Sequence, residues 1–155
     1  MPQGRMFSAG STAPEAVTAA RDLVQLSGAT GSIAFIHSVT ISQTNIEGDA
    51  NAEMLGLEWF RCTTLGAGTA MTEQSTLPGD TAAHVAVSNA VLSTGLTQIG
   101  AGAMNLQAGW DKIWHPEPRI LVPAVSTEGV CFQCEAPDAS TTFVVNIEWE
   151  EIATT

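Results

Sequence analysis

The segment that most constrains the fold of this chain is residues 141–152, where large apolar side chains alternate with smaller or polar ones. Phe143, Val145, Ile147 and Trp149 occupy every second position, and the residues between them become progressively polar. A strand with one buried face and one wetter face has this period of two. We therefore expect a strand here, with partner strands supplied by the residues that precede it.

Further strands are predicted in the preceding residues, separated by segments rich in Gly, Pro, Asn and Ser. They are residues 32–43, 53–63, 83–92, 119–122 and 129–135, with a weaker candidate at 21–26. In the first of these, Ile33, Phe35, His37, Val39 and Ile41 are expected to share one face. The turn chemistry of residues 136–140 predicts that the last two strands pair as an antiparallel hairpin.

These patterns predict eight or nine short strands and little helix, which is typical of an all-β protein. Two long connections, residues 64–82 and 93–104, favour crossovers between two sheets over a simple meander. We therefore predict a two-sheet antiparallel sandwich, jelly-roll-like in its connections, as a single domain over residues 15–155. Residues 1–14 are predicted to form an N-terminal arm or an edge strand.

The charge of the chain excludes some classes of partner. It carries 16 Asp and Glu against 5 Lys and Arg, a formal net charge of −11. Such a charge repels phosphate backbones and anionic lipids, so we expect neither nucleic acid nor a membrane as a partner. The acidity serves either solubility or a partner surface that is locally basic.

Nothing in the sequence indicates export or membrane insertion. The first residues lack the apolar run of a signal peptide, and no window approaches the roughly 18 apolar residues of a membrane span. The odd number of cysteines, three, fits a reducing compartment. We expect a protein that is made and folded in a cytoplasm.

Cys131 and Cys134 form a C-x-x-C sequence, a spacing that redox and zinc sites use. On a strand, residues three apart point to opposite faces, so the two thiols are expected to diverge. A zinc site also needs a second ligand pair at matching spacing, and only Cys62 and three scattered histidines are available. We interpret the three cysteines as buried structural thiols.

No pattern in the sequence indicates an enzyme. It contains no Gly-x-Ser-x-Gly elbow, no phosphate-binding glycine run and no complete calcium loop. Glu148 and Glu150 share the wetter face of the last strand without an obvious acidic mate, so we interpret them as an acidic surface. His37, His84 and His115 fall on different predicted elements. We expect a non-enzymatic protein without a cofactor or a metal.

Trp110 and Trp114 allow two interpretations. Placed four residues apart, they could share a face and form a glycan platform, which is one way that β-sandwiches bind sugars. Alternatively, one packs in the core and the other lies at an interface with another chain. The candidate interface residues are Trp110, Trp114, His115, Glu148 and Glu150.

Several features occur in a particular order along the chain. They are Phe7-Ser8-Ala9, the strand 33–43, residues 53–61 running into a Gly/Thr loop, a strand at Trp110, the corner Pro116-Glu117-Pro118-Arg119, and the ending Ile147-Glu148-Trp149-Glu150-Glu151-Ile152. In this order they resemble the small jelly-roll structural proteins of tailed bacteriophages, namely head decoration (cement) proteins and minor capsid proteins.

The resemblance implies a non-enzymatic virion protein that is made in the host cytoplasm and docks on the capsid exterior. It would form a homo-oligomer, with a trimer favoured, and would decorate and stabilise the shell by contacting the major capsid protein. Residues 1–14 and 64–82 are the expected latches, since segments of this kind order on binding. The alternative function is a carbohydrate- or receptor-binding β-sandwich on the virion, which would use Trp110 and Trp114.

Overall fold

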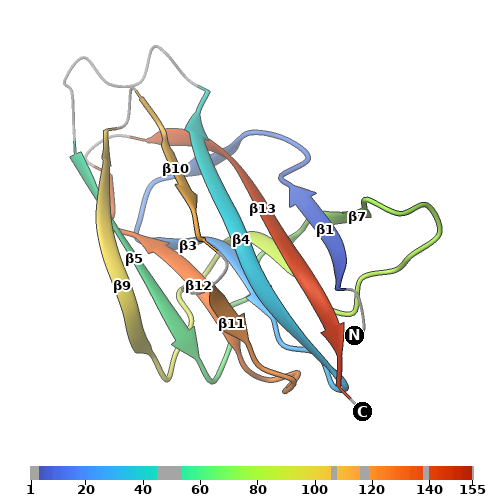
Figure 1. Ribbon diagram of the computed structural model, residues 1–155. Coiled ribbons are helices and arrows are strands. Elements are labelled where there is room, and N and C mark those ends of the chain that lie inside the picture. Colours follow the sequence, from blue (N-terminus) through green and yellow to red (C-terminus); the bar gives the residue numbers. More distant parts are fainter. Residues whose placement is uncertain (1–3, 45–53, 106–107, 116–118, 138–139, 155) are drawn as a thin grey trace.

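The chain folds into two antiparallel β-sheets that pack face to face, which confirms the predicted all-β sandwich (Figure 1). The structure, a computed structural model, describes residues 4–44, 54–105, 108–115, 119–137 and 140–154. Residues 45–52, which separate the predicted strands 32–43 and 53–63, and the prolines of the corner at 116–118 lie outside the described residues. In the part that is described, no helix is long and apolar enough to cross a membrane.

Thirteen strands are present among the described residues, more than the eight or nine predicted. They are β1 (Arg5–Gly10), β2 (Glu15–Val17), β3 (Arg21–Ser27), β4 (Ser32–Gln43), β5 (Met54–Cys62), β6 (Thr69–Ala70), β7 (Thr72–Ser75), β8 (Ala86–Ala90), β9 (Thr97–Asn105), β10 (Trp110–Ile113), β11 (Ile120–Val122), β12 (Gly129–Cys134) and β13 (Thr141–Ala153). Four of them, β2, β6, β7 and β9, lie outside the predicted strands. They lack a row of large apolar side chains, which is the signal that reveals a strand in a sequence.

The strands divide into two sheets. Sheet A has the order β10-β4-β13-β1-β7, with β11 also paired to β4 and β2 to β13. Sheet B has the order β6-β8-β3-β12-β5-β9. Of the two predicted crossovers, the one in residues 64–82 is present, from β6 in sheet B to β7 in sheet A. Residues 93–104 instead contain most of β9, which belongs to the same sheet as β8.

β13 is the central strand of sheet A. It pairs with β4 along most of its length and with β1 over its second half. Its apolar row is buried against sheet B as predicted, with no member more than 2% exposed: Phe143, Val145, Ile147 and Trp149. By pairing with β4 and β1, β13 holds both of these strands against the same side of the core.

β1 comes from the segment predicted to be an arm or an edge strand. It lies between β13 and β7 and pairs with both. Phe7 of β1 is buried and stacks on Trp149, with the ring centroids 5.9 Å apart. Residues 5–10 are thus bound on both edges and packed against the core.

The predicted hairpin between the last two strands is wrong. β12 pairs with β3 and β5 in sheet B, whereas β13 lies in sheet A. Both strands carry a row of large apolar residues, represented by Phe132 and Trp149, in the same core cluster. Two such rows bury each other most fully from opposite sheets, which pack about 10 Å apart. The chain therefore crosses the core between β12 and β13.

The predicted face of β4 is also wrong, because a β-bulge interrupts the alternation at His37. Ser38 is in register with Glu148 and Ile36 with Trp149, which leaves His37 as the extra residue. The fully buried residues of β4 are Ala34, Ile36, Val39 and Ile41. Before the bulge, the opposite set of residues from the predicted one faces the core.

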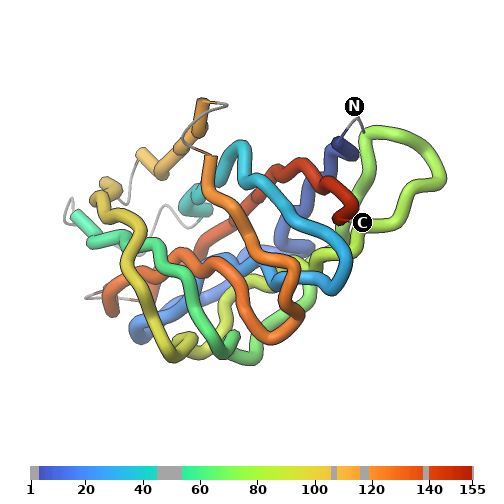
Figure 2. The backbone as a smooth tube through the Cα atoms, turned by 60° about the horizontal axis from the view of Figure 1, so that its bottom comes forward, coloured from blue at the N-terminus to red at the C-terminus, as the bar shows by residue number. Residues whose placement is uncertain are grey.

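Residues 64–82, predicted as a long connection, contain two strands that belong to different sheets. β6 pairs with β8 in sheet B and β7 pairs with β1 in sheet A, on either side of the buried Met71. After β7 the chain projects beyond the sheets (Figures 1 and 2). Leu77, in this connection, is 59% exposed.

A buried carboxylate fastens the end of β13 to the segment that leads into β8. Glu151 continues the inward row after Trp149, and both Glu151 and His84 are buried. The carboxylate accepts hydrogen bonds from the backbone N–H groups of Ala83 and His84 at 3.0–3.1 Å and from the Trp149 indole at 3.0 Å. Its Oε1 also lies 3.1 Å from Nδ1 of His84.

These contacts set the pKa of Glu151. Burial raises the pKa, but the hydrogen bonds from the His84 side chain, from Trp149 and from the backbone of His84 and Ala83 lower it to about 2, from an ordinary 4.5. Between these two values the unfolded chain binds a proton that the folded chain does not. The stability that Glu151 contributes is therefore present above pH 4.5 and is lost as the pH falls toward 2.

We predict that Glu151→Gln lowers the free energy of unfolding at pH 7 by about 2–3 kcal/mol, because the buried network loses its negative charge and one of its two acceptor oxygens becomes an NH2 donor. Between pH 4.5 and 2 the wild type should lose about 3 kcal/mol more than the variant. Urea denaturation at a series of pH values measures both quantities. Glu148→Gln, on the exposed face of the same strand, is the control and should change stability by at most about 0.5 kcal/mol. Equal pH slopes for wild type and Glu151→Gln would contradict the prediction.

Candidate functional site

The two tryptophans predicted as a glycan platform or interface pack between the sheets. Trp110 of β10 lies against Trp59 and Phe132 of sheet B, with centroid distances of 5.8 and 6.5 Å. Trp114 contacts the same two rings at 6.3 and 5.8 Å and is only 9% exposed. Trp110 is partly buried. Both indoles therefore pack against the same two core rings, Trp59 and Phe132, and they do not form an open aromatic platform.

The remaining candidate interface residues lie in two separate places. His115 is exposed and follows β10 at the side of sheet A. Glu148 and Glu150 lie on the outer face of β13, as predicted, and β4 separates β13 from β10. The structure therefore does not bring the five candidates into one patch.

Glu150 is neutralised by a cation. Arg119 donates a hydrogen bond from its guanidinium to Glu150 Oε2 at 2.6 Å, and its Nη1 lies 2.7 Å from Nε2 of His37. The same guanidinium lies over the ring of Phe35, 5.2 Å from its centroid. The bulge in β4 places His37 on the outer face, where it reaches this cluster. Of the two predicted surface acids, only Glu148 is without a cationic partner among the described residues.

The cysteines are arranged as predicted. Cys131 packs with Phe60 and Cys62 on the outer side of sheet B, whereas Cys134 belongs to the main core, so the thiols of the C-x-x-C sequence diverge. All three thiols are free and buried. Burial raises the pKa of Cys134 to about 11, which leaves its thiol protonated at neutral pH.

A second buried carboxylate ties the connection after β8 to β3. Asp22 Oδ2 accepts hydrogen bonds from the Ser93 hydroxyl at 2.5 Å, from the Ser93 backbone at 3.0 Å and from Gln25 at 2.6 Å. Burial raises the pKa of Asp22, and these hydrogen bonds oppose the increase. Asp22, Gln25 and Ser93 are all inaccessible to a substrate, so the cluster holds the fold together.

One long segment carries no charged side chain. Residues 81–110 contain no Asp, Glu, Lys or Arg, although the chain as a whole has 21 of them. We call residues 81–110 the neutral flank. It includes β8 and β9, and its only histidine, His84, is buried. Among its described residues, the exposed large apolar side chains are Val85, Val91, Leu92, Leu96 and Ile99, between 37% and 49% exposed.

The neutral flank reaches the edge of sheet B. β9 pairs with β5 on one side, and no other strand in the described part of the chain pairs with its opposite side. Figure 1 shows β9 at the outer edge of the molecule. Its residues alternate Gly and Ala from Gly100 to Ala103, and a Cβ at Gly100 would lie 2.6 Å from the indole of Trp59. The side chains of β9 itself are consequently small or uncharged, although Glu58 of the neighbouring β5 accepts a hydrogen bond from Gln98 at 3.0 Å.

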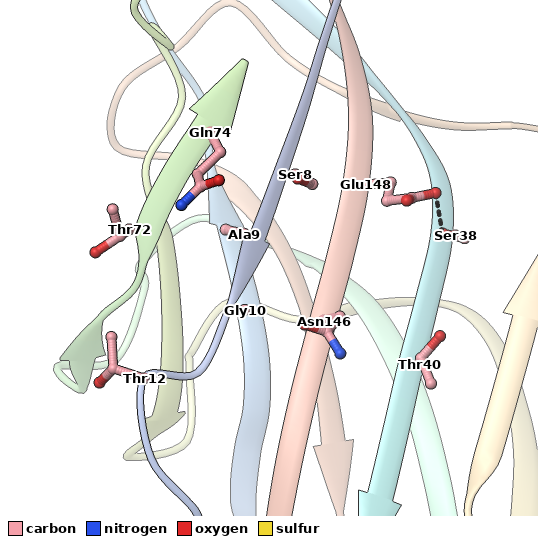
Figure 3. A pocket seen from close by; sticks show the side chains of 10 residues that line it. All are labelled: Ser8, Ala9, Gly10, Thr12, Ser38, Thr40, Thr72, Gln74, Asn146 and Glu148. Atoms are coloured by element: carbon pink, nitrogen blue, oxygen red, sulfur yellow. Dashed lines mark hydrogen bonds between the residues drawn. The ribbon is translucent and has the colours of Figure 1, made fainter. Parts of the chain in front are cut away.

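A groove lies on the outer face of sheet A, across β7, β1, β13 and β4 (Figure 3). Its volume is about 640 Å³. Ser8 and Gly10 of β1, Ser38 and Thr40 of β4, and Asn146 and Glu148 of β13 line it, with Thr72 and Gln74 of β7 on one side. A Cβ at Gly10 would collide with the Asn146 amide, so the glycine leaves room for that side chain.

Comparison with known proteins identified no relative of this chain. No family model, curated protein or solved structure matches it. Functional inference therefore depends on the geometry described above.

Apart from Trp110 at the end of the neutral flank and Glu148 in the groove, the residues of these two features were not among the predicted site residues. The absence of charge over residues 81–110 is visible in the sequence and is the signal that identifies the flank. The groove has no such signal, because its residues come from four strands whose order in the sheet differs from their order in the chain.

We predict that Trp114→Ala lowers the free energy of unfolding by about 3–5 kcal/mol, as removal of a large buried aromatic side chain does. Trp110→Ala should cost less, because Trp110 is partly exposed. Urea denaturation followed by circular dichroism measures both. Ile113→Ala, at a side chain 65% exposed between the two tryptophans, should change stability by no more than about 0.5 kcal/mol. A Trp114→Ala protein as stable as the wild type would show that the side chain is exposed to solvent rather than packed in the core.

Proposed function

We propose that the protein is a non-enzymatic structural component of a virion, which decorates and stabilises the capsid of a tailed phage. It acts as a homo-oligomer, for which the resemblance favours a trimer, and contacts the major capsid protein on the outside of the shell. The observation that carries the proposal is the neutral flank. At β9 it provides a sheet edge without charged side chains of its own, at which an acidic chain can approach other copies of itself.

Charge decides where such contacts form. With a net charge of −11, two copies repel each other over most of their surfaces. Along the neutral flank this repulsion is weakest, and burial of Leu92, Leu96 and Ile99 gains roughly 25 cal/mol per Å² of apolar area. Interface centres are similarly depleted of charged residues.

The connection after β7 supports a contact with the shell. It projects beyond the sheets, and it presents Leu77 at 59% exposure (Figure 2). It lies within residues 64–82, one of the two segments expected to act as latches. The other expected latch, residues 1–14, includes β1, whose pairing on both edges makes residues 5–10 a part of the sandwich. The projecting connection is therefore the better candidate.

The proposed function predicts that the purified protein sediments as an oligomer at micromolar concentration and binds to capsids of the phage that encodes it. Bound protein should raise the temperature at which the capsids release their DNA. Leu96→Glu and Ile99→Glu should weaken self-association and capsid binding, because they add negative charge to the neutral flank. Analytical ultracentrifugation and co-sedimentation with capsids measure the two effects.

Thr18→Glu is the matched control, since it adds the same charge at an exposed residue outside the neutral flank. It should leave both association and capsid binding unchanged. A wild-type protein that stays monomeric and neither binds capsids nor changes their heat resistance would refute the proposed function. Equal effects of Thr18→Glu and Leu96→Glu would show that net charge, rather than the flank, controls assembly.

A further inference from the structure

We propose that the groove on the outer face of sheet A binds a neutral oligosaccharide. The inference is independent of the proposed function, because it rests on other residues and another face of the molecule. It also differs from the sugar platform considered for Trp110 and Trp114, since neither tryptophan lines the groove.

The groove has the size of a ligand site and the lining of a hydrogen-bonding one. Its volume of about 640 Å³ falls within the range of roughly 300–1,000 Å³ that small-molecule sites occupy. Hydroxyl and carboxamide side chains dominate its lining, including Thr40, Gln74 and Asn146. A hydroxyl both donates and accepts, and a carboxamide does each at one end. These are the groups that match the hydroxyls of a sugar.

Several of these groups have hydrogen-bonding capacity to offer. Between the side chains drawn in Figure 3 a single hydrogen bond forms, from the Ser38 hydroxyl to Glu148 at 2.8 Å. The amides of Gln74 and Asn146 have no hydrogen-bonding partner among the described residues. Glu148 keeps a second carboxylate oxygen, which can accept from a ligand hydroxyl.

The charge of the groove selects against other ligands. Glu148 is its only charged lining residue, and the chain is strongly acidic, so a phosphate, a sulfate or a nucleic acid is repelled. No large apolar side chain lines it, so a lipid or an aromatic compound gains little there. A neutral polyhydroxylated ligand meets neither obstacle.

Over β4, β13 and β1 the groove offers no edge to a peptide added as an extra strand, and only β7, at its side, is an edge strand. Strand addition needs a free sheet edge. The groove lies over β1 and β13, and each of these strands is paired on both sides. Recognition must therefore come from side chains that point out of the sheet.

The test is a titration of the labelled full chain with a panel of neutral oligosaccharides, followed by amide chemical shifts in NMR spectra. We expect shifts confined to β1, β4, β7 and β13. Asn146→Ala and Gln74→Ala should each weaken binding by up to about tenfold, the loss of one net hydrogen bond. Gln98→Ala, an exposed amide on sheet B, is the control and should bind as the wild type does.

Circular dichroism of each variant verifies its fold, and Gln74 lies on the edge strand β7, where truncation leaves the core intact. Raising the salt concentration should leave affinity unchanged, since a neutral ligand has no charge to screen. Three results would overturn the proposal: no oligosaccharide shifts the groove amides at millimolar concentration, the shifts map to β10 around Trp110, or only a basic peptide binds and salt releases it.

Discussion

The structure depends on β13 being buried in the middle of sheet A. This strand brings its four large apolar residues to the interface between the sheets, and it holds β4 and β1 in register on either side. Glu151, next in the same row, extends the contact from apolar packing to a hydrogen-bonded anchor on the segment before β8. β13 thus holds the strands of sheet A together and also connects sheet A to sheet B.

The sequence identifies the strong strands because their alternation follows from burial on one face. It does not identify their neighbours, because pairing is a property of two segments that are distant in the chain. The hairpin predicted for β12 and β13 is wrong for this reason, since each strand satisfies its apolar row across the core. The bulge at His37 is hidden for a related reason: the extra residue is defined only by the register with Glu148 and Trp149 on the partner strand.

The candidate sites also differ in how far the sequence alone predicts their geometry. The divergence of Cys131 and Cys134 follows from strand geometry alone and is predictable. The pairing of Glu150 with Arg119 is not, because it needs the bulge to bring His37 outward and needs β11 to lie beside β4. Trp110 and Trp114 carried two interpretations because an aromatic side chain serves a core as well as a sugar, and only the positions of Trp59 and Phe132 separate them.

The pairing of β1 with β13 also determines where the chain can be extended. Arg5 is in register with Glu151, so the first and last strands lie side by side in the middle of one sheet. The start of β1 and the end of β13 lie on one side of the molecule, and β9 lies on the opposite side in both views (Figures 1 and 2). A tag or a displayed peptide fused at either end would leave the β9 edge unobstructed. A short linker between the ends would also suit circular permutation.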